Sequence, residues 1–455
     1  MLKASKLLPT PLWMLLSAAF AAVVVWKAPK AALALGLFLL AYGLWKTLRT
    51  RNRDGAAHLY AGLIVGAEVF FRMSFAGLPW EFGKIAVFLL LLTGLIVERL
   101  RKPFSLIFLF YFLMLLPGVF VPDWPNMEAF KKEFMFTFFG EVVLVVSVFY
   151  FFRRPMTMEQ ITRLGRWIVT GVFMSSVLLF LKTPDYAAIH YGGGSNFVAS
   201  GGFGPNQVSA ILGLGMVLTG AFVLLNKRLF ISRWIDLGLL GLFTMQGFFT
   251  LSRGGLMSAG LALFVAVSVV YRSSPSRAVK LLHLSLWKFL LLGLLILGIS
   301  YQVDQVTQGA LAKRYLNVDQ YGQVVKEDYT TKRGDIVKDD WKTFLRFPIT
   351  GAGIGGGRIY RAQNTGISAA HVELSRLPAE HGILGLLALL ILLFYPVFTF
   401  FRIGNLQSRF FLALFIAYGV LTMSHNAIRL AMPSFIYGLG YVMIYLESKI
   451  RKGEK

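Results

Sequence analysis

The sequence contains no cysteine and little charge. Asp, Glu, Lys and Arg together make up only 15% of its 455 residues. The absence of cysteine excludes disulfide bonds, thiolate metal sites and cysteine nucleophiles. Acidic residues are especially scarce, since 22 Asp and Glu stand against 46 Lys and Arg. Hydrophobic residues make up 56% of the chain and include 41 Phe, a profile that excludes an ordinary soluble globular protein.

Apolar runs recur along the whole chain, and most are about 17–22 residues long, enough to cross the ~30 Å hydrocarbon layer as helices. Short basic connectors separate most of them. We therefore predict an all-α, polytopic membrane protein with about 12–14 transmembrane helices. The predicted spans lie near residues 11–26, 31–45, 58–75, 82–97, 104–121, 134–152, 167–182, 205–225, 234–251, 255–271, 286–302, 383–401, 410–425 and 430–446.

The net charge of +24 would indicate a nucleic-acid partner in a soluble protein. Here the basic residues gather in alternate connectors, as the positive-inside rule describes for cytoplasmic loops. This alternation predicts that both termini are cytoplasmic, that the surroundings are a lipid bilayer and that no nucleic acid is bound. Residues 11–26 lack a small-residue cleavage site and run on into the next apolar segment, so we predict no removable signal peptide.

The spans and their connectors divide the chain into four predicted regions. One region is a long insert between two spans, and the alternation of charge places this insert outside the cytoplasm, as a periplasmic loop. The regions are an N-terminal transmembrane bundle (1–200), core transmembrane helices that carry an SRGG motif (201–302), the large periplasmic loop (303–382) and C-terminal transmembrane helices (383–455).

The periplasmic loop is much longer than the other connectors, and loops beyond about 15 residues are usually functional or disordered. Its stretch RGDIVKDDWKTFLRFP spaces apolar residues at near-helical intervals until Pro348. We predict an amphipathic helix there, which lies on the membrane surface or covers a cavity. Asp339 and Asp340 are interpreted as the solvated face of this helix.

Three shorter polar or glycine-rich segments are assigned to the same outer face as the large loop. They are YGGGSNFVASGGFGPNQ (191–207), LSRGG (251–255) and SHNAIR (424–429). This assignment rests on the Lys and Arg residues of the cytoplasmic connectors and does not depend on the residues of the three segments themselves. We therefore expect a functional site where these segments and the loop meet.

Arg253 lies in a tight outer connector between two apolar spans. A guanidinium at the edge of a bilayer must be paired, reach the interface or face a wet cavity. Arg253 either ends a helical hairpin or binds an anion, because its planar fork suits phosphate geometry and Gly254 beside it lets backbone N–H groups approach. Asn206 follows Pro205 at the predicted start of a helix, and a helix N-terminus at this face would also favour an anion.

The stretch AHVELSRLPAEHGILG (370–385) gathers ionisable residues directly before an apolar span. On a helix, Arg376 lies three residues after Glu373 and four before Glu380, so both carboxylates can hold it. One interpretation is a ladder of ion pairs on an exposed helix. The other is a functional site in which His371 accepts a proton and the neighbouring Glu373 raises its basicity.

Two further patterns have alternative interpretations. The sequence GAGIGGG (351–357) matches a dinucleotide fingerprint, but no strand–helix unit surrounds it, so we interpret it as a turn against a ligand or another helix. Within the predicted spans, Glu68 and Arg72 are spaced to form an ion pair, whereas Glu141 stands alone. Such intramembrane charges are either functional or pair between helices.

Several of these residues together resemble the O-antigen ligase and O-antigen polymerase superfamily of bacterial inner membranes. The resemblance covers roughly residues 200–395, and the order and spacing of the elements carry it. The matching residues are Ser252, Arg253 and Gly254, then Pro348, Gly351 and Gly353, then His371, Glu380, Gly382 and Gly385.

The resemblance implies a membrane-embedded, GT-C-like glycosyltransferase that works in the bacterial inner membrane with a periplasmic active site. Such enzymes transfer a glycan from undecaprenyl diphosphate, with inversion, to lipid A-core in ligases or to a carrier-linked glycan in polymerases. They need no metal or other cofactor. His371 would be the catalytic base, and Arg253 would hold the diphosphate, together with Arg376 or Arg361. The further candidates for catalysis or substrate binding are Glu373, Asn206, Gly254 and Glu380.

Whether the chain is a ligase or a polymerase stays open. Family members often have Asn after the histidine, where this chain has Val372, and ligases tend to carry an arginine near the segment GGFGPNQ, which has none. The alternatives are a flippase or transporter of lipid-linked glycans and a cell-wall glycan polymerase. A transporter would place its charged residues near the bilayer midplane, whereas this chain gathers them at one surface.

Overall fold

The computed structural model describes residues 10–98, 103–122, 126–183, 185–192, 194–283, 286–318, 323, 333–365 and 372–445. The described part of the chain is almost entirely helical. Its helices are α1 (Thr10–Lys27), α2 (Ala31–Thr50), α3 (Ala56–Gly66), α4 (Glu68–Ser74), α5 (Phe82–Val97), α6 (Leu106–Leu115), α7 (Pro117–Phe120), α8 (Met127–Glu133), α9 (Phe139–Phe151), α10 (Met158–Lys182), α11 (Pro205–Leu224), α12 (Arg233–Phe249), α13 (Arg253–Ser273), α14 (Pro275–Leu282), α15 (Leu286–Val306), α16 (Ala310–Leu316), α17 (Arg333–Arg346), α18 (Gly356–Thr365), α19 (Glu373–Arg402), α20 (Leu406–Asn426) and α21 (Ala431–Leu439).

The remaining elements are short. A π-helical segment, η1 (Phe134–Phe138), joins α8 to α9, and a 3₁₀ turn, η2 (Val198–Ser200), precedes α11. Strand β1 (Pro155–Thr157) pairs in parallel with β2 (Met443–Tyr445). This strand pair joins chain segments that are far apart in the sequence.

Several helices are long and apolar enough to cross a membrane, as expected for a multi-pass membrane protein. Eight helices of the described residues meet this criterion, and α3 with α4 would make a ninth, bent by 49°. Shorter apolar helices lie at Pro11–Lys27, Phe82–Val97 and Leu106–Phe120. The predicted all-α membrane protein is confirmed at this level, whereas the total of about 12–14 spans stays a prediction.

The predicted spans at 58–75 and 430–446 are interrupted. The span at 58–75 is broken at Ala67, between α3 and α4. The span at 430–446 contains only the nine residues of α21, followed by a turn and β2. Gly438 and Gly440 lower the helix propensity at the end of α21. Pairing of β2 with β1 then satisfies the backbone in place of a longer helix.

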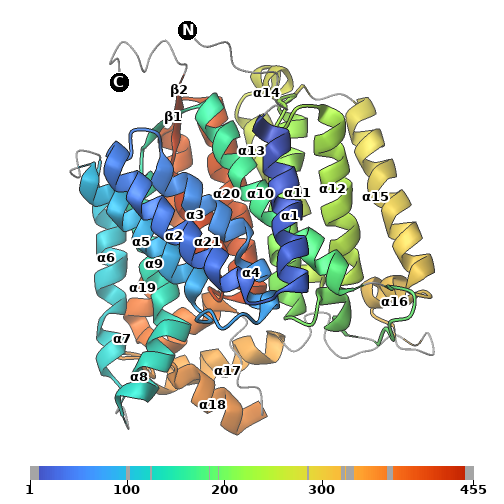
Figure 1. The fold of residues 1–455 in the computed structure, drawn as a ribbon. Coiled ribbons are helices and arrows are strands. Elements are labelled where there is room, and N and C mark those ends of the chain that lie inside the picture. Colours follow the sequence, from blue (N-terminus) through green and yellow to red (C-terminus); the bar gives the residue numbers. More distant parts are fainter. Residues whose placement is uncertain are drawn as a thin grey trace.

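The helices form one bundle with two distinct ends (Figure 1). The strand pair and α14 lie at one end, which we call the strand end. Helices α7, α8, α16, α17 and α18 lie at the opposite end, which we call the loop end. The connector before α11, the start of α13 and the last turn of α20 belong to the loop end, because hydrogen bonds and close packing connect them to one another and to α16.

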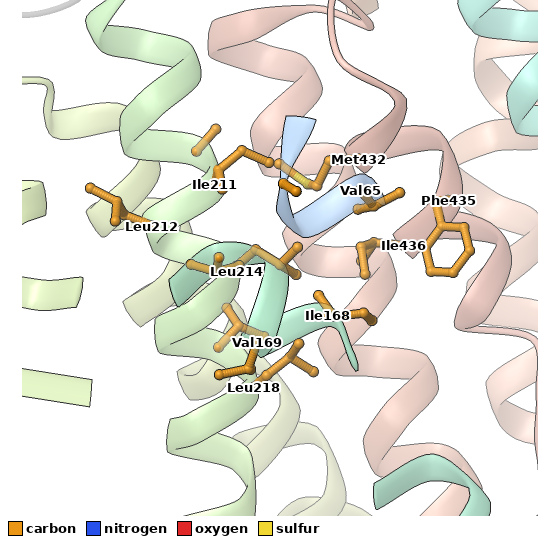
Figure 2. Close-up of a cluster of buried hydrophobic side chains, with 14 of the residues drawn as sticks. Val65, Ile168, Val169, Ile211, Leu212, Leu214, Leu218, Met432, Phe435 and Ile436 are labelled. Atoms are coloured by element: carbon orange, nitrogen blue, oxygen red, sulfur yellow. The ribbon is translucent and has the colours of Figure 1, made fainter. Parts of the chain in front are cut away.

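The core is built from side chains of widely separated helices. Figure 2 shows Val65 of α3, Ile168 and Val169 of α10 and several residues of α11 and α21 meeting in one cluster. Glycines allow the close approach of the backbones, since a Cβ at Gly66 would collide with the carbonyl of Ile168. Small residues serve this purpose at many membrane helix interfaces. This packing positions α3, α10, α11 and α21 relative to one another, and α11 carries Asn206 of the candidate site.

The insert between α15 and α19 contains the predicted amphipathic helix. Helix α17 ends at Arg346, before Pro348, as the sequence predicts. The interpretation of Asp339 and Asp340 as a solvated face is wrong, because both are buried. Asp340 forms an ion pair with Arg361 of α18 and accepts a hydrogen bond from Ser375 (2.5 Å) of α19. Asp340 thus faces the neighbouring helices, whereas Asp339 pairs with Lys342 of its own helix (3.3 Å).

Candidate functional site

The predicted site residues at the starts of α11 and α13 lie together. Ser252, directly before α13, donates a hydrogen bond from its hydroxyl to Oδ1 of Asn206 (2.8 Å). The hydroxyl of Ser209 donates to the carbonyl of Ser252 (2.9 Å). Arg253 is the first residue of α13. Two of the predicted outer segments therefore meet as expected, and both helices direct their N-termini towards the loop end.

Gly254 has a packing role that the sequence did not indicate. A Cβ at Gly254 would collide with the imidazole of His425 on α20, and one at Gly255 would collide with the backbone of Ser209 on α11. These glycines let α13 approach both neighbouring helices closely. The prediction that Gly254 helps to bind an anion stays a prediction.

Arg253 belongs to a cluster of arginines from three helices, which we call the arginine cluster (Arg253, Arg314 and Arg333). Arg253 Nη1 donates a hydrogen bond to the carbonyl of Arg314 (3.2 Å) on α16. Burial, together with the positive charges of Arg253 and Arg333, lowers the pKa of Arg314 to about 10. Arg314 is therefore close enough to both of the other arginines to be repelled by them. An anion placed among them would relieve this repulsion.

His425 and Asn426 end α20 beside the arginine cluster. The Nδ1 atom of His425 lies 2.9 Å from the carbonyl of Leu421 and 3.4 Å from the hydroxyl of Ser258. Among the described residues, the buried Nε2 of His425 and the side-chain amide of Asn426 have no hydrogen-bond partner. Buried polar atoms without partners are rare in folded proteins. A ligand or a water molecule at this end of α20 would supply the missing partners of His425 and Asn426.

Arg72 connects the start of α11 to the loop after α20. Its guanidinium donates to Oε1 of Gln207 (2.8 Å), to Glu68 (2.9 Å) and to the carbonyl of Arg429 (2.9 Å). The predicted pair of Glu68 with Arg72 is confirmed. Burial lowers the pKa of Arg429 to about 10, and the neighbouring charges of Arg72 and Arg361 contribute. Two arginines thus lie side by side where α4 meets the loop after α20.

Arg376 lies at the centre of a buried ion cluster. It pairs with Glu373, with Glu380 (2.6 Å) and with Glu141 of α9 (3.4 Å). The hydroxyl of Tyr111 donates to Glu141 (2.6 Å), so this glutamate does not stand alone. All of these residues are buried. The interpretation as an exposed ladder is therefore wrong, because the charges join α19 to α9 inside the bundle, and Tyr111 adds a contact from α6.

The two candidates for the second phosphate-binding arginine both have carboxylate partners. Arg376 is enclosed by Glu373, Glu380 and Glu141, and Arg361 pairs with Asp340. Both arginines are buried. These contacts give each arginine a structural role, and phosphate binding by either of them stays a prediction. Sequence reasoning missed Arg314 and Arg333, which lie nearer to Arg253.

The predicted base, His371, lies outside the described residues. Its neighbour Val372 directly precedes α19, and Glu373 is the first residue of that helix. The second carboxylate oxygen of Glu373 accepts a hydrogen bond from the backbone N–H of Ile428 (3.1 Å). The start of α19 is thereby fastened to the loop that contains Arg429. The catalytic roles of His371 and Glu373 stay predictions.

The glycine-rich turn after α17 packs against a kink in α19. Gly382 has φ 60° and ψ −141°, which interrupts the helix. The N–H of Gly353 donates to the carbonyl of Glu380 (2.9 Å), and the N–H of Ile383 donates to the carbonyl of Pro348 (2.8 Å). The interpretation of this segment as a turn against another helix is confirmed. The turn satisfies backbone groups that the kink frees.

The described residues contain no group of three or more His, Asp or Glu side chains that could hold a metal ion. This part of the chain offers arginines, amides and imidazoles, which bind anions and polar ligands. No family model matches the sequence, and no curated protein matches it. The function therefore has to be argued from the site itself.

Proposed function

We propose that this protein is a membrane-embedded glycosyltransferase. It would move a glycan from a polyprenyl diphosphate, undecaprenyl diphosphate in bacteria, to a hydroxyl group of an acceptor at the periplasmic face of the inner membrane. The observation that carries the proposal is the arginine cluster, in which Arg253, Arg314 and Arg333 come from three helices and meet at one end of an apolar bundle.

A diphosphate suits this cluster for two reasons. Guanidinium groups bind phosphate oxygens through paired N–H donors and keep their charge at neutral pH. The repulsion of Arg314 by Arg253 and Arg333 is a source of binding energy, because a dianionic group would neutralise it. The N-terminus of α13, where Arg253 lies, adds partial positive charge.

A lipid-linked donor also suits the surroundings of the cluster. Arg314 lies on α16, which follows the apolar helix α15 after only a short turn. A polyprenyl tail in the bilayer would therefore have its diphosphate near the membrane boundary, where these arginines lie. Neither a soluble nucleotide sugar nor a metal ion is required for this arrangement, because the arginines supply the positive charge.

The reaction is a substitution at the anomeric carbon of the donor. The acceptor oxygen forms a bond to this carbon as the bond from the carbon to the phosphate oxygen breaks, and the diphosphate leaves with the electron pair. The proton of the acceptor hydroxyl passes to a base, and His371 is the candidate. Because diphosphate is a good leaving group, the protein mainly positions two chains and neutralises developing charge.

The decisive experiment uses the purified full chain in proteoliposomes, with undecaprenyl diphosphate-linked glycan and an acceptor glycan added. Mass spectrometry of the products should show a new glycosidic bond and free undecaprenyl diphosphate. Analysis of surface glycans from cells that lack the protein then separates the two versions of the proposal. Unlinked full-length polymer on the carrier would indicate a ligase, and single repeat units would indicate a polymerase. Movement of the glycan across the bilayer without a new bond would refute the proposal in favour of a flippase.

A further inference from the structure

A cavity separate from the arginine cluster lies at the loop end, between α4 and α5. Its volume is about 210 Å³, and its lining comes from residues of α4, the connector to α5 and the first residues of α5. Aromatic rings surround it, among them Phe71, Phe75, Trp80 and Phe82, and the ion pair of Glu68 and Arg72 contributes polar atoms to the wall.

Trp80 is positioned as one wall of the cavity. The guanidinium carbon of Arg72 lies 5.2 Å from the centroid of the Trp80 ring, and the ring of Phe203 lies 5.4 Å away. These neighbours hold the indole, yet 48% of Trp80 remains exposed. Phe75 at the rim is 63% exposed. An indole that is fixed by its neighbours and still exposed offers a flat apolar face to a ligand.

The polar part of the lining has unused hydrogen-bonding capacity. The guanidinium of Arg72 carries five N–H donors, and its bonds to Gln207, Glu68 and the carbonyl of Arg429 use three of them. Glu68 compensates the charge of Arg72 at 2.9 Å, so the pair is neutral as a whole. Gly83 makes room for the carboxylate of Glu68, since a Cβ there would collide with it. A neutral pair with an open donor suits a hydroxyl group better than a phosphate.

The same arginine forms the border with the candidate site. Arg72 donates to Gln207, which follows Asn206, and Asn206 accepts from the serine before Arg253. Arg72 therefore contacts both the cavity and the start of α11, which belongs to the predicted donor site. A glycan chain whose reacting end lies at the arginine cluster could place a later sugar ring in this cavity.

We propose that this cavity is a saccharide subsite, in which a sugar ring of a glycan substrate stacks on Trp80 and a sugar hydroxyl accepts a hydrogen bond from the guanidinium of Arg72. The combination fits a sugar because one face of a pyranose ring carries C–H groups and its rim carries hydroxyls. A lipid chain would leave the Arg72 donor without a partner. The inference rests on the proposed function, because that function supplies the glycan.

Saturation-transfer difference NMR on the full chain in nanodiscs tests the subsite. The probe is the water-soluble oligosaccharide released by mild acid from the surface glycan of cells that make this protein. Wild-type protein should transfer saturation to the C–H groups of one ring. Trp80→Leu, which keeps apolar bulk but loses the aromatic face, should weaken binding about tenfold. Trp80→Phe should retain most of the signal.

Trp234→Ala is the matched control, because Trp234 is 82% exposed at the start of α12, far from the cavity. It should bind the oligosaccharide as the wild type does. The proposal is overturned if wild-type protein shows no transfer or if Trp80→Leu binds equally well. Crosslinking of a photoactivatable fatty acid to residues 75–83 without competition by the oligosaccharide would also overturn it.

A second arm of the experiment separates this inference from the proposed function. Binding of undecaprenyl diphosphate to the same nanodiscs should be unaffected by Trp80→Leu and weakened by Arg253→Lys. Loss of the oligosaccharide signal in Trp80→Leu alone supports the subsite. Unchanged lipid diphosphate binding in Arg253→Lys counts against the proposed function and leaves the result for the cavity standing.

Discussion

Arg253 and Arg314 hold each other's helices in place. Arg253 donates a hydrogen bond to the carbonyl of Arg314 (3.2 Å), and Nε of Arg314 donates to the carbonyl of Leu251 (3.3 Å), two residues before Arg253. This exchange fastens α16 to the start of α13. It also keeps two like-charged side chains closer than they would otherwise lie, and a bound anion would stabilise that arrangement.

Arg253→Lys should reduce glycan transfer by roughly 10²–10³-fold, because lysine keeps the charge but loses the planar fork that binds two phosphate oxygens. Initial rates in proteoliposomes measure the effect. Arg272→Lys is the control, since Arg272 is exposed in the last turn of the same helix. A wild-type rate for Arg253→Lys would place the diphosphate elsewhere.

His371→Ala should leave the protein in the membrane and abolish transfer, because no base would then take the proton of the acceptor hydroxyl. Donor binding should persist, so the loss should appear in the rate of the chemical step. His190→Ala serves for comparison, since that side chain is exposed in the connector before α11. Full activity of His371→Ala would end the assignment of the base.

Arg376→Ala should lower the stability of the protein by about 3–5 kcal/mol, because buried carboxylates would lose their cation. Glu141→Gln should change it by less than about 1 kcal/mol, since the amide oxygen still accepts from the hydroxyl of Tyr111. Thermal unfolding in detergent compares the two variants. Equal midpoints for Arg376→Ala and wild type would show that the ion cluster does not stabilise the bundle.

Gly382→Ala should destabilise the turn between α17 and α19. An alanine at φ 60° and ψ −141° is strained, and its Cβ would crowd the carbonyl of Ile349 at 2.5 Å. Gly260→Ala is a matched substitution at an exposed position of α13, where no atom lies within 4 Å of the new Cβ. It should raise stability by up to about 1 kcal/mol. Opposite shifts of the unfolding midpoint are expected, and shifts of the same sign would contradict this account.

The lack of cysteine makes the orientation in the membrane directly testable, because a single introduced thiol is the only one present. Gly192 and Gly404 are exposed, and a Cβ at either meets no atom within 4 Å. In intact spheroplasts, a membrane-impermeant maleimide should label Gly192→Cys and leave Gly404→Cys unlabelled. The reverse pattern would place the loop end in the cytoplasm and remove the basis of the proposed reaction.

The sequence predicts the features that depend on local pattern. Apolar runs locate most of the long helices, and the spacing of apolar residues finds α17 together with its end before Pro348. Charge alternation brings Asn206 and Arg253 to one face, where the structure shows their segments in contact. These successes share one cause, since each signal is contained in a window of about one helix length.

The features that the sequence did not predict depend on contacts between distant segments. Arg314 and His425 carry no local pattern that distinguishes them from other polar residues near helix ends. The burial of Asp340 depends on Arg361, which lies on another helix. Trp80 reads as an ordinary interfacial aromatic until its cavity is seen. Long-range packing alone gives these residues their neighbours.

Helix α15 has few neighbours in the bundle. Only 6% of its apolar stretch is buried, and it lies at the edge of the molecule beside α12 (Figure 1). A helix packed along one side needs the least packing energy to move, and α15 continues after a short turn into the helix that carries Arg314. Tilting of α15 would open a sideways passage from the lipid to the arginines. The polyprenyl tail of the proposed donor would enter there, while the rest of the bundle stays together.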